Sequence, residues 1–251
     1  MIFGLLLGDS SGANALMYFV MILMSLVAAY LAIVPHEIAH GLVALWNGDP
    51  TAKYNGRLTM NPVKHFDLIG FIMMFLMGFG YAKPVPVNPG NFKHYKRGLF
   101  AVAIAGIATN IIIAFLSTLF YSLCSYGMFN VKTDQAYNVL VYLKAFFQLL
   151  ASLNLSLAFF NLLPIFPLDG YRMIESFTSP YNRFCRFMRV NGRYILYGLI
   201  GLSLIISMAS RYPIPSWFRY FDILGTYRSF FAGNLYNLFI NFWRLMIPGV
   251  I

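Results

Sequence analysis

The chain has 251 residues, of which 59% are hydrophobic and only 10% are charged, whereas soluble domains carry about 25% charged residues. This composition excludes a water-soluble fold. The net charge of +10 does not indicate a nucleic-acid partner, because the basic residues lie in short stretches between long apolar segments. The length suffices for several membrane spans of about 20 residues each but leaves no room for a sizeable soluble domain. We expect residues 1–251 to form a single domain embedded in the lipid bilayer.

Six apolar stretches follow one another along the chain. They lie at about 14–46, 68–81, 99–123, 139–163, 194–209 and 219–247. The second is short for a full span, which needs about 20 apolar residues. The sequence therefore predicts an all-α polytopic membrane protein with about five to six transmembrane helices, in which 68–81 is a short re-entrant segment.

Two polar stretches lie between the first apolar segments. Residues 47–66 contain the turn signals Asn47-Gly48 and Asn55-Gly56 beside short alternating runs, a pattern that predicts a small β-hairpin at the membrane surface. Residues 82–98 contain three prolines in Lys83-Pro84-Val85-Pro86-Val87-Asn88-Pro89, which exclude a helix or a central strand. This second stretch is either a stiff connecting loop or a functional edge segment.

The distribution of basic residues predicts the topology. Lys and Arg number 3 in 47–66, 4 in 82–98 and 5 in 164–193, but 0 in 1–13 and 1 in 124–138. If 68–81 crossed the membrane, 47–66 and 82–98 would face opposite sides, against the positive-inside rule. If it is re-entrant, all three basic stretches face the cytoplasm. A re-entrant backbone is allowed only where it is buried in protein or lines a water-filled cavity.

The first apolar segment contains the motif His36-Glu37-Ile38-Ala39-His40. Two histidines four residues apart project from the same face of a helix, close enough to share one zinc ion. Glu37 lies about 100° around the helix, where it can reach a metal-bound water as general base without being a ligand. An ionised Glu37 at membrane depth is costly unless a cation compensates it, so zinc binding explains its presence.

A catalytic zinc site normally has three protein ligands and an open position for water. His65 and His94 stand beside Lys64 and Lys93 in polar stretches, so we expect them to be solvated. Asp169, at the predicted cytoplasmic end of the 139–163 helix, is the candidate for the third ligand, although Asp169-Gly170 is also a common turn.

Two alternatives to an enzyme remain open from these residues. The first is a proton or metal-ion pathway built on His36, Glu37, Asp169 and the intramembrane Asn residues, which would need polar groups distributed through the membrane depth. The second is a non-catalytic binding or scaffold protein, which would hold a ligand without hydrolysing it. An intact Glu37 argues against it, because ligand binding does not need a general base.

Taken together, these residues resemble the site-2 protease family of intramembrane zinc metalloproteases, in its compact bacterial or archaeal branch. The resemblance covers about 31–172. It rests on four blocks in the family's order: Pro35 to Gly41, Gly80 to Pro89, Ala105-Gly106 with Asn110, and Asn161-Leu162-Leu163-Pro164 through Leu168-Asp169-Gly170. It implies a catalytic core at about 14–172, whereas the helices expected at about 194–247 are additional and residues 194–251 match nothing in the family.

The resemblance implies that His36, His40 and Asp169 bind Zn²⁺ and that Glu37 is the general base. The expected reaction is hydrolysis of peptide bonds in or next to transmembrane segments of membrane-protein substrates. Asn161 would bind the substrate backbone or the oxyanion, although an interhelical hydrogen bond explains such an amide equally well. The extended segment at Val85 and Val87 would pair with an unfolded substrate strand. The expected location is a bacterial or archaeal cell membrane, with the active site toward the cytoplasm.

Overall fold

The computed structural model describes residues 12–65, 67, 83–179, 181–210 and 221–247. Within these ranges the chain is helical and contains no strand. The long helices are α2 (Gly12–Trp46), α6 (Tyr95–Asn130), α7 (Asp134–Asn161), α9 (Arg183–Ala209) and α10 (Ile223–Met246). The short ones are α3 (Thr51–Tyr54), α4 (Pro62–His65), η1 (Pro89–Asn91) and α8 (Asp169–Phe177). The predicted all-α fold is therefore confirmed for the described part of the chain.

Over the same residues, 4 helices are long and apolar enough to cross a membrane: α2 from Met17 onward, α6, α7 and α9. The expected number of five to six spans is thus not supported. α10 does form at the place of the 219–247 segment, but Arg228, Arg244 and three asparagines lower its apolar character. The 68–81 segment lies outside the described residues.

The predicted hairpin at 47–66 is wrong. Both Asn-Gly pairs do make turns, since Gly48 and Gly56 have positive φ angles of 105° and 60°. Between them, however, the chain forms the single helical turn α3, which starts when Tyr54 N–H donates to Pro50 O (3.0 Å). Proline suits the start of a helical turn, and the few residues between the two glycines are too short to pair as strands.

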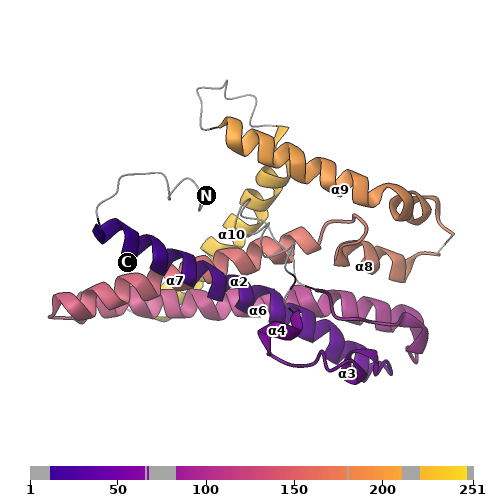
Figure 1. Ribbon diagram of the computed structural model, residues 1–251, viewed down its shortest axis with the longest axis horizontal. Coiled ribbons are helices and arrows are strands. Elements are labelled where there is room, and N and C mark those ends of the chain that lie inside the picture. The colour runs from indigo at the N-terminus through magenta and orange to yellow at the C-terminus, as the bar shows by residue number, and fades with distance from the viewer. Residues whose placement is uncertain (1–11, 66, 68–82, 180, 211–220, 248–251) are drawn as a thin grey trace.

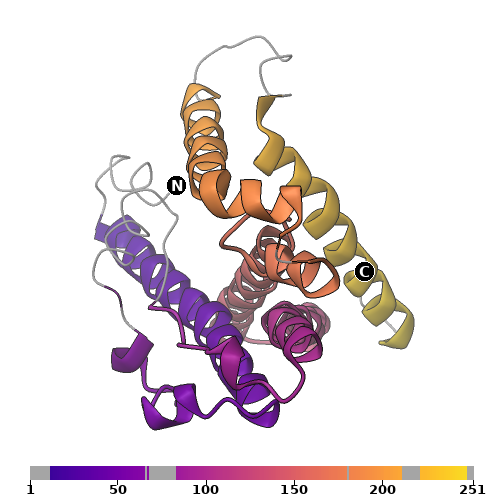
Figure 2. The same cartoon turned by 90° about the vertical axis from the view of Figure 1, so that its right-hand side faces the viewer.

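Helix α6 is the centre of the bundle. It packs against α2, α7, α8 and α10, and Figure 2 shows α2 and α10 on opposite sides of it. Small side chains at the crossings, Ala114 of α6 and Ala232 of α10, bring the helices close around Leu155 of α7. The α10 contact is strengthened by the Trp243 indole N–H, which lies 3.3 Å from Phe115 O and 3.2 Å from Thr118 Oγ1.

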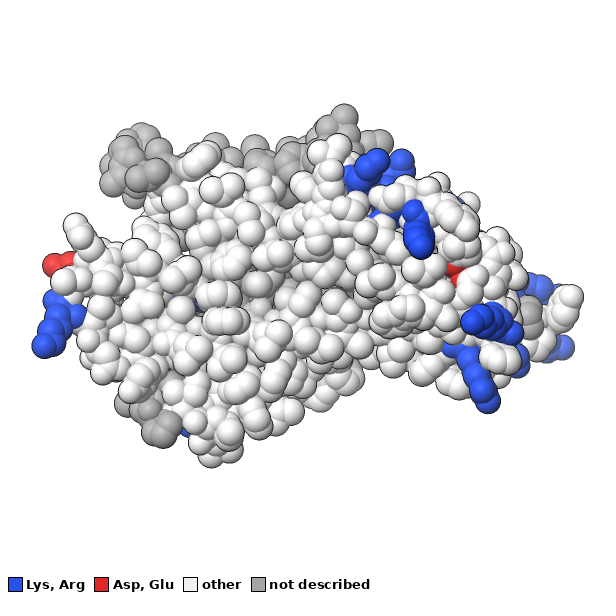
Figure 3. Space-filling view, turned by 90° about the horizontal axis from the view of Figure 1, so that it is seen from below, with Lys and Arg blue, Asp and Glu red and all other residues white. Residues whose placement is uncertain are grey.

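Basic side chains gather at one end of this bundle. Figure 3 shows Lys and Arg concentrated at the end where α3 and α8 lie in Figure 1. The three basic stretches of the sequence, 47–66, 82–98 and 164–193, supply them. The fold therefore separates a strongly basic end from an opposite end with few charges.

Candidate metal centre

His36 and His40 lie on α2, about three turns and about two turns before the helix ends at Trp46. Helix α2 continues through Pro35, so the two histidines keep the helical spacing predicted from the sequence. Their side chains are buried, with 4% and 6% of each residue exposed. The two Nε2 atoms are 3.0 Å apart, and the rings meet nearly at right angles.

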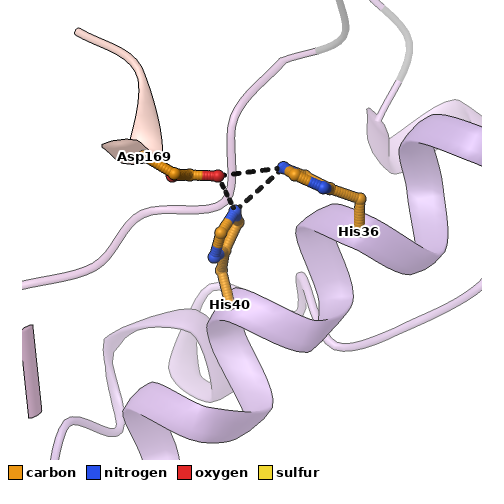
Figure 4. A group of neighbouring side chains, drawn as sticks. All are labelled: His36, His40 and Asp169. Atoms are coloured by element: carbon orange, nitrogen blue, oxygen red, sulfur yellow. Dashed lines mark hydrogen bonds and ion pairs between the residues drawn. The ribbon is translucent and has the colours of Figure 1, made fainter. Parts of the chain in front are cut away.

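Asp169 reaches the same point from the first residue of α8. Its Oδ2 lies 3.4 Å from His36 Nε2 and 3.2 Å from His40 Nε2, and Figure 4 shows the three side chains pointing toward one another. Asp169 is also buried, at 6% exposed. The fold thus brings together the three residues that the sequence predicted as ligands, although Asp169 is distant in the chain from the two histidines.

The spacing of the three donor atoms fits a tetrahedral zinc ion. With metal–ligand bonds of about 2.0–2.1 Å, two ligands of a tetrahedron are about 3.3–3.4 Å apart. The observed separations of 3.0, 3.2 and 3.4 Å are close to that edge length. Asp169 Oδ2 is buried and has no hydrogen-bond partner among the described residues, an arrangement that a coordinated cation would satisfy.

A backbone carbonyl orients one of the histidines. His40 Nδ1 lies 2.7 Å from Val102 O on α6. A carbonyl can only accept, so in the neutral ring Nδ1 carries the proton and the lone pair of Nε2 faces His36 and Asp169. Metal-binding histidines are usually fixed in this way.

Gly106 lies on α6 one turn beyond Val102. Because it has no side chain, the donor atoms of the two histidines and Asp169 have room to meet. A Cβ at this position would lie 2.5 Å from His36 Cε1 and 2.6 Å from both Cε1 and Nε2 of His40. Any side chain here would therefore displace the imidazoles. The sequence showed Gly106 beside Ala105, but nothing in the sequence indicated that it lines the site.

The first turn of α8 is held against the end of α7. A Cβ on Gly170 would lie 2.2 Å from Leu162 O and 2.5 Å from Leu163 O. Only glycine allows this approach, because the colliding atoms belong to the backbone and cannot move aside. The close contact fixes Asp169, the neighbouring residue, at the centre of the bundle.

The other side of α8 is held by α9. Tyr171 is 1% exposed; its hydroxyl lies 3.3 Å from Cys185 O and accepts from Arg189 Nε at 3.1 Å. Arg189 also pairs with Glu175 of α8 at 3.3 Å.

Burial opposes ionisation of Asp169, but the neighbouring His40 and His36 hold the pKa of its carboxyl below the usual range.

Glu37 is half-buried beside the three candidate ligands and does not join their group. Its Oε2 accepts the Val85 backbone N–H at 2.9 Å. Val85 is buried, and its Cγ1 would lie 3.0 Å from a Cβ on Gly41, so the extended segment is pressed against α2. Val87 packs on the cluster of Ala44, Phe92, Leu99 and Val102.

Asn161 stands apart from this arrangement. It is the last residue of α7 and is half-buried. Its side chain forms no hydrogen bond with any of the residues that the structure describes, so the geometry assigns it no structural partner and leaves its proposed substrate role open.

Arg57 is a residue whose importance the sequence did not indicate. It is 7% exposed, and its guanidinium donates to Lys64 O, Lys83 O and, at 3.1 Å, Pro84 O. In addition, Lys83 N–H donates to His65 O at 3.0 Å. Arg57 therefore joins the two backbone segments that flank 66–82 and anchors the start of the segment that carries Val85.

Asp49 anchors the other end of that segment. Its carboxylate accepts from Asn88 N at 2.7 Å and from Asn91 Nδ2 at 2.8 Å, and it also bonds both the N–H and the hydroxyl of Thr51. Asp49 is fully buried. The extended segment is thus fixed at Arg57, Glu37 and Asp49 in turn.

The expectation that His65 is solvated is wrong. His65 is 1% exposed, and its Nε2 lies 2.8 Å from Thr59 O. Its backbone oxygen also accepts the Lys83 N–H, so the segment that Arg57 anchors lies against it. His94 is exposed, as expected. Neither belongs to the group formed by His36, His40 and Asp169.

The fold and the site together define a polytopic membrane protein with a metal-binding centre built on a membrane-spanning helix. The profile of peptidase family M50 matches residues 24–200, and the chain belongs to this family. This finding confirms the resemblance to the site-2 proteases.

The chain is 44% identical over 151 residues to "Putative zinc metalloprotease YwhC" of Bacillus subtilis (strain 168). That alignment covers 58% of this chain and 64% of the relative, so it spans less than two thirds of either protein. No solved structure matches the chain significantly. Zinc is the metal that the family and the donor set both indicate.

Proposed function

We propose that this protein is an intramembrane zinc metalloprotease that hydrolyses peptide bonds in or next to transmembrane segments of membrane-protein substrates. The observation that carries the proposal is the convergence of His36, His40 and Asp169 within 4.8 Å of one another, next to Glu37, on a helix that is apolar enough to span a membrane. Membership of peptidase family M50 supports the reaction type.

Each residue near the centre has a separate role in this proposal. His36, His40 and Asp169 hold the zinc ion, which when bound supplies Lewis acidity and lowers the pKa of a water molecule. Glu37 accepts the proton of the attacking water and delivers it to the leaving amine. The Val85 N–H occupies one oxygen of Glu37 and fixes the orientation of the carboxylate, so the other oxygen handles the proton.

The clustering of these groups argues against a proton or ion pathway. A relay needs titratable groups spread through the membrane depth. Here the three buried groups meet at one level and face one another.

For substrate binding, we propose that the backbone at Val85 and Val87 pairs with an unwound substrate strand. Pro84 and Pro86 have no N–H, and the Val85 N–H already donates to Glu37, so pairing would use the carbonyls and the Val87 backbone. Val87→Pro should raise KM while zinc content stays unchanged.

Asn161 would bind the substrate backbone or the oxyanion, and Asn161→Ala should then lower turnover without loss of zinc.

We further propose that the basic end of the bundle faces the cytoplasm of a bacterial or archaeal cell, with the site toward that side. The positive-inside rule supports this orientation, because 47–66, 82–98 and 164–193 share that end. The hydrogen bond between Lys83 N and His65 O supports a re-entrant path, since the two flanks of 66–82 are adjacent. Reporter fusions that placed 47–66 and 82–98 on opposite sides would contradict it.

The decisive experiment separates metal binding from turnover. Glu37→Gln keeps the size of the side chain, so zinc should stay bound while cleavage of a membrane-helix reporter is lost. His36→Ala and Asp169→Ala should lose both, because a two-ligand site binds zinc far more weakly. Asp134→Ala, an exposed aspartate in the first turn of α7, is the control and should change neither. A fully active Glu37→Gln would end the proposal.

A further inference from the structure

A cavity of about 410 Å³ lies beside α4 and the extended segment, on the basic part of the molecule. Three cationic residues line it, Arg57, Lys64 and Lys83, together with the apolar Val63 and the prolines at 84 and 86. Asn55 completes the lining, so no carboxylate of the described residues faces the cavity. Such a lining attracts an anion.

Arg57 provides a second, independent indication of an anionic ligand. Both terminal nitrogens of its guanidinium are used on backbone carbonyls. The third nitrogen, Nε, is buried and has no hydrogen-bond partner among the described residues. No carboxylate of the described residues pairs with this guanidinium, so a phosphate in the cavity would compensate its charge.

The surroundings place the cavity at the level of lipid headgroups. Helix α2 ends at Trp46, which is 72% exposed, and exposed tryptophan is typical of the membrane–water interface. The chain around the cavity then exposes the large apolar side chains of Tyr54 (82%), Met60 (47%) and Val63 (79%). Apolar side chains beside a cationic cavity match the acyl chains and the headgroup of a lipid.

From the cavity, the buried guanidinium and the exposed apolar rim, we propose that this cavity binds the phosphate group of an anionic membrane lipid. The lipid lies with its phosphate between Arg57, Lys64 and Lys83 and its acyl chains along Val63 and Met60. The positive-inside rule puts this end of the molecule against the leaflet in which anionic lipids attract basic segments. Binding at this cavity does not depend on the proposed proteolysis.

The test measures thermal unfolding of the zinc-loaded protein in a neutral detergent, titrated with short-chain phosphatidylglycerol, phosphatidylcholine or inorganic phosphate. Phosphatidylglycerol should raise the unfolding midpoint at the lowest concentration. The double variant Lys64→Gln with Lys83→Gln should weaken this effect by about 5-fold per lysine removed. The double variant Lys64→Arg with Lys83→Arg, which keeps the charge, should retain it.

The matched control is Lys93→Gln with Lys96→Gln, which removes the same charge from exposed positions of the same basic end that do not line the cavity. This control should respond to phosphatidylglycerol like the original protein. Equal weakening in both glutamine variants would show attraction to the whole basic end and overturn the proposal. It is also overturned if phosphatidylcholine stabilises as well as phosphatidylglycerol, or if inorganic phosphate reproduces the effect at the same concentration.

Discussion

Replacing Gly106 by alanine would put a methyl group into the space where the candidate ligands meet. The added Cβ would lie 2.5 Å from His36 Cε1 and 2.6 Å from His40 Nε2, whereas real Cβ contacts are essentially never shorter than 3.0 Å. The rings must therefore move by at least about 0.5 Å, which exceeds the tolerance of about 0.2 Å in metal–ligand distances. Changes in the residues that support metal ligands typically cost about 10- to 100-fold in metal affinity.

We therefore expect Gly106→Ala to raise the zinc dissociation constant by at least about 10-fold. The assay is a titration of the purified protein against a competing zinc chelator, with the thermal unfolding of the metal-free protein measured in parallel. Gly201→Ala on α9 is the control, because a Cβ there meets nothing within 4 Å. An unchanged zinc affinity in a correctly folded Gly106→Ala protein would refute the geometry of the centre.

Three further changes test the supports of the site. Arg57→Lys keeps the charge but cannot bridge two backbone segments, so amide hydrogen exchange at Lys83 and Val85 should accelerate and turnover should fall while zinc content stays constant. In Asp49, burial opposes ionisation, but hydrogen bonds from Thr51 and two asparagines lower its pKa below the ordinary 3.8. Asp49→Asn should therefore lower the free energy of unfolding by about 1.5–3 kcal/mol above pH 4. Thermal unfolding should show that this difference from the original protein shrinks as the pH falls through the lowered pKa of Asp49. Gly170→Ala should separate α8 from α7 and lower zinc affinity, since its Cβ would lie 2.2 Å from Leu162 O; unchanged affinity would count against α8 as the source of the third ligand.

The parts of this protein that could be predicted from sequence are those encoded by local spacing. Long apolar runs predicted the helices, because backbone groups at membrane depth must be satisfied within the segment. The i, i+4 spacing predicted that His36 and His40 face the same point, and their Nε2 atoms are 3.0 Å apart. Asp169 required an argument about topology, and the structure brings it within 3.4 Å of both histidines.

The prediction of a hairpin at 47–66 failed because the two turn signals were interpreted without the residues that lie between them. The Asn-Gly pairs at 47–48 and 55–56 do turn the chain. Asp49 and Pro50 start a helical turn there instead of a strand, and the side chain of Asp49 is committed to contacts with η1. Those partners are 39 and 42 residues away, too distant for any local pattern to show.

Several supports of the centre have no residue signature at all. Val102 acts through its carbonyl and Val85 through its N–H, so almost any residue could supply these groups. Gly106 acts by having no side chain, and many glycines in membrane helices serve packing alone. Arg57 donates only to backbone carbonyls, so it has no acidic partner in the sequence to reveal it.

The position of Asp169 connects the metal centre to a helix beyond the predicted core at 14–172. Gly170 presses α8 against the end of α7, while Tyr171 and Glu175 attach it to Cys185 and Arg189 of α9. A candidate ligand at the first residue of a nine-residue helix depends on these contacts and on the packing of α8 against α6 to keep its distance to α2, because so short a helix is not stable alone. The family match, which continues to residue 200, includes this part of α9. We therefore propose that the start of α9 helps to hold the candidate third ligand and that the catalytic unit includes this part of the chain beyond 172.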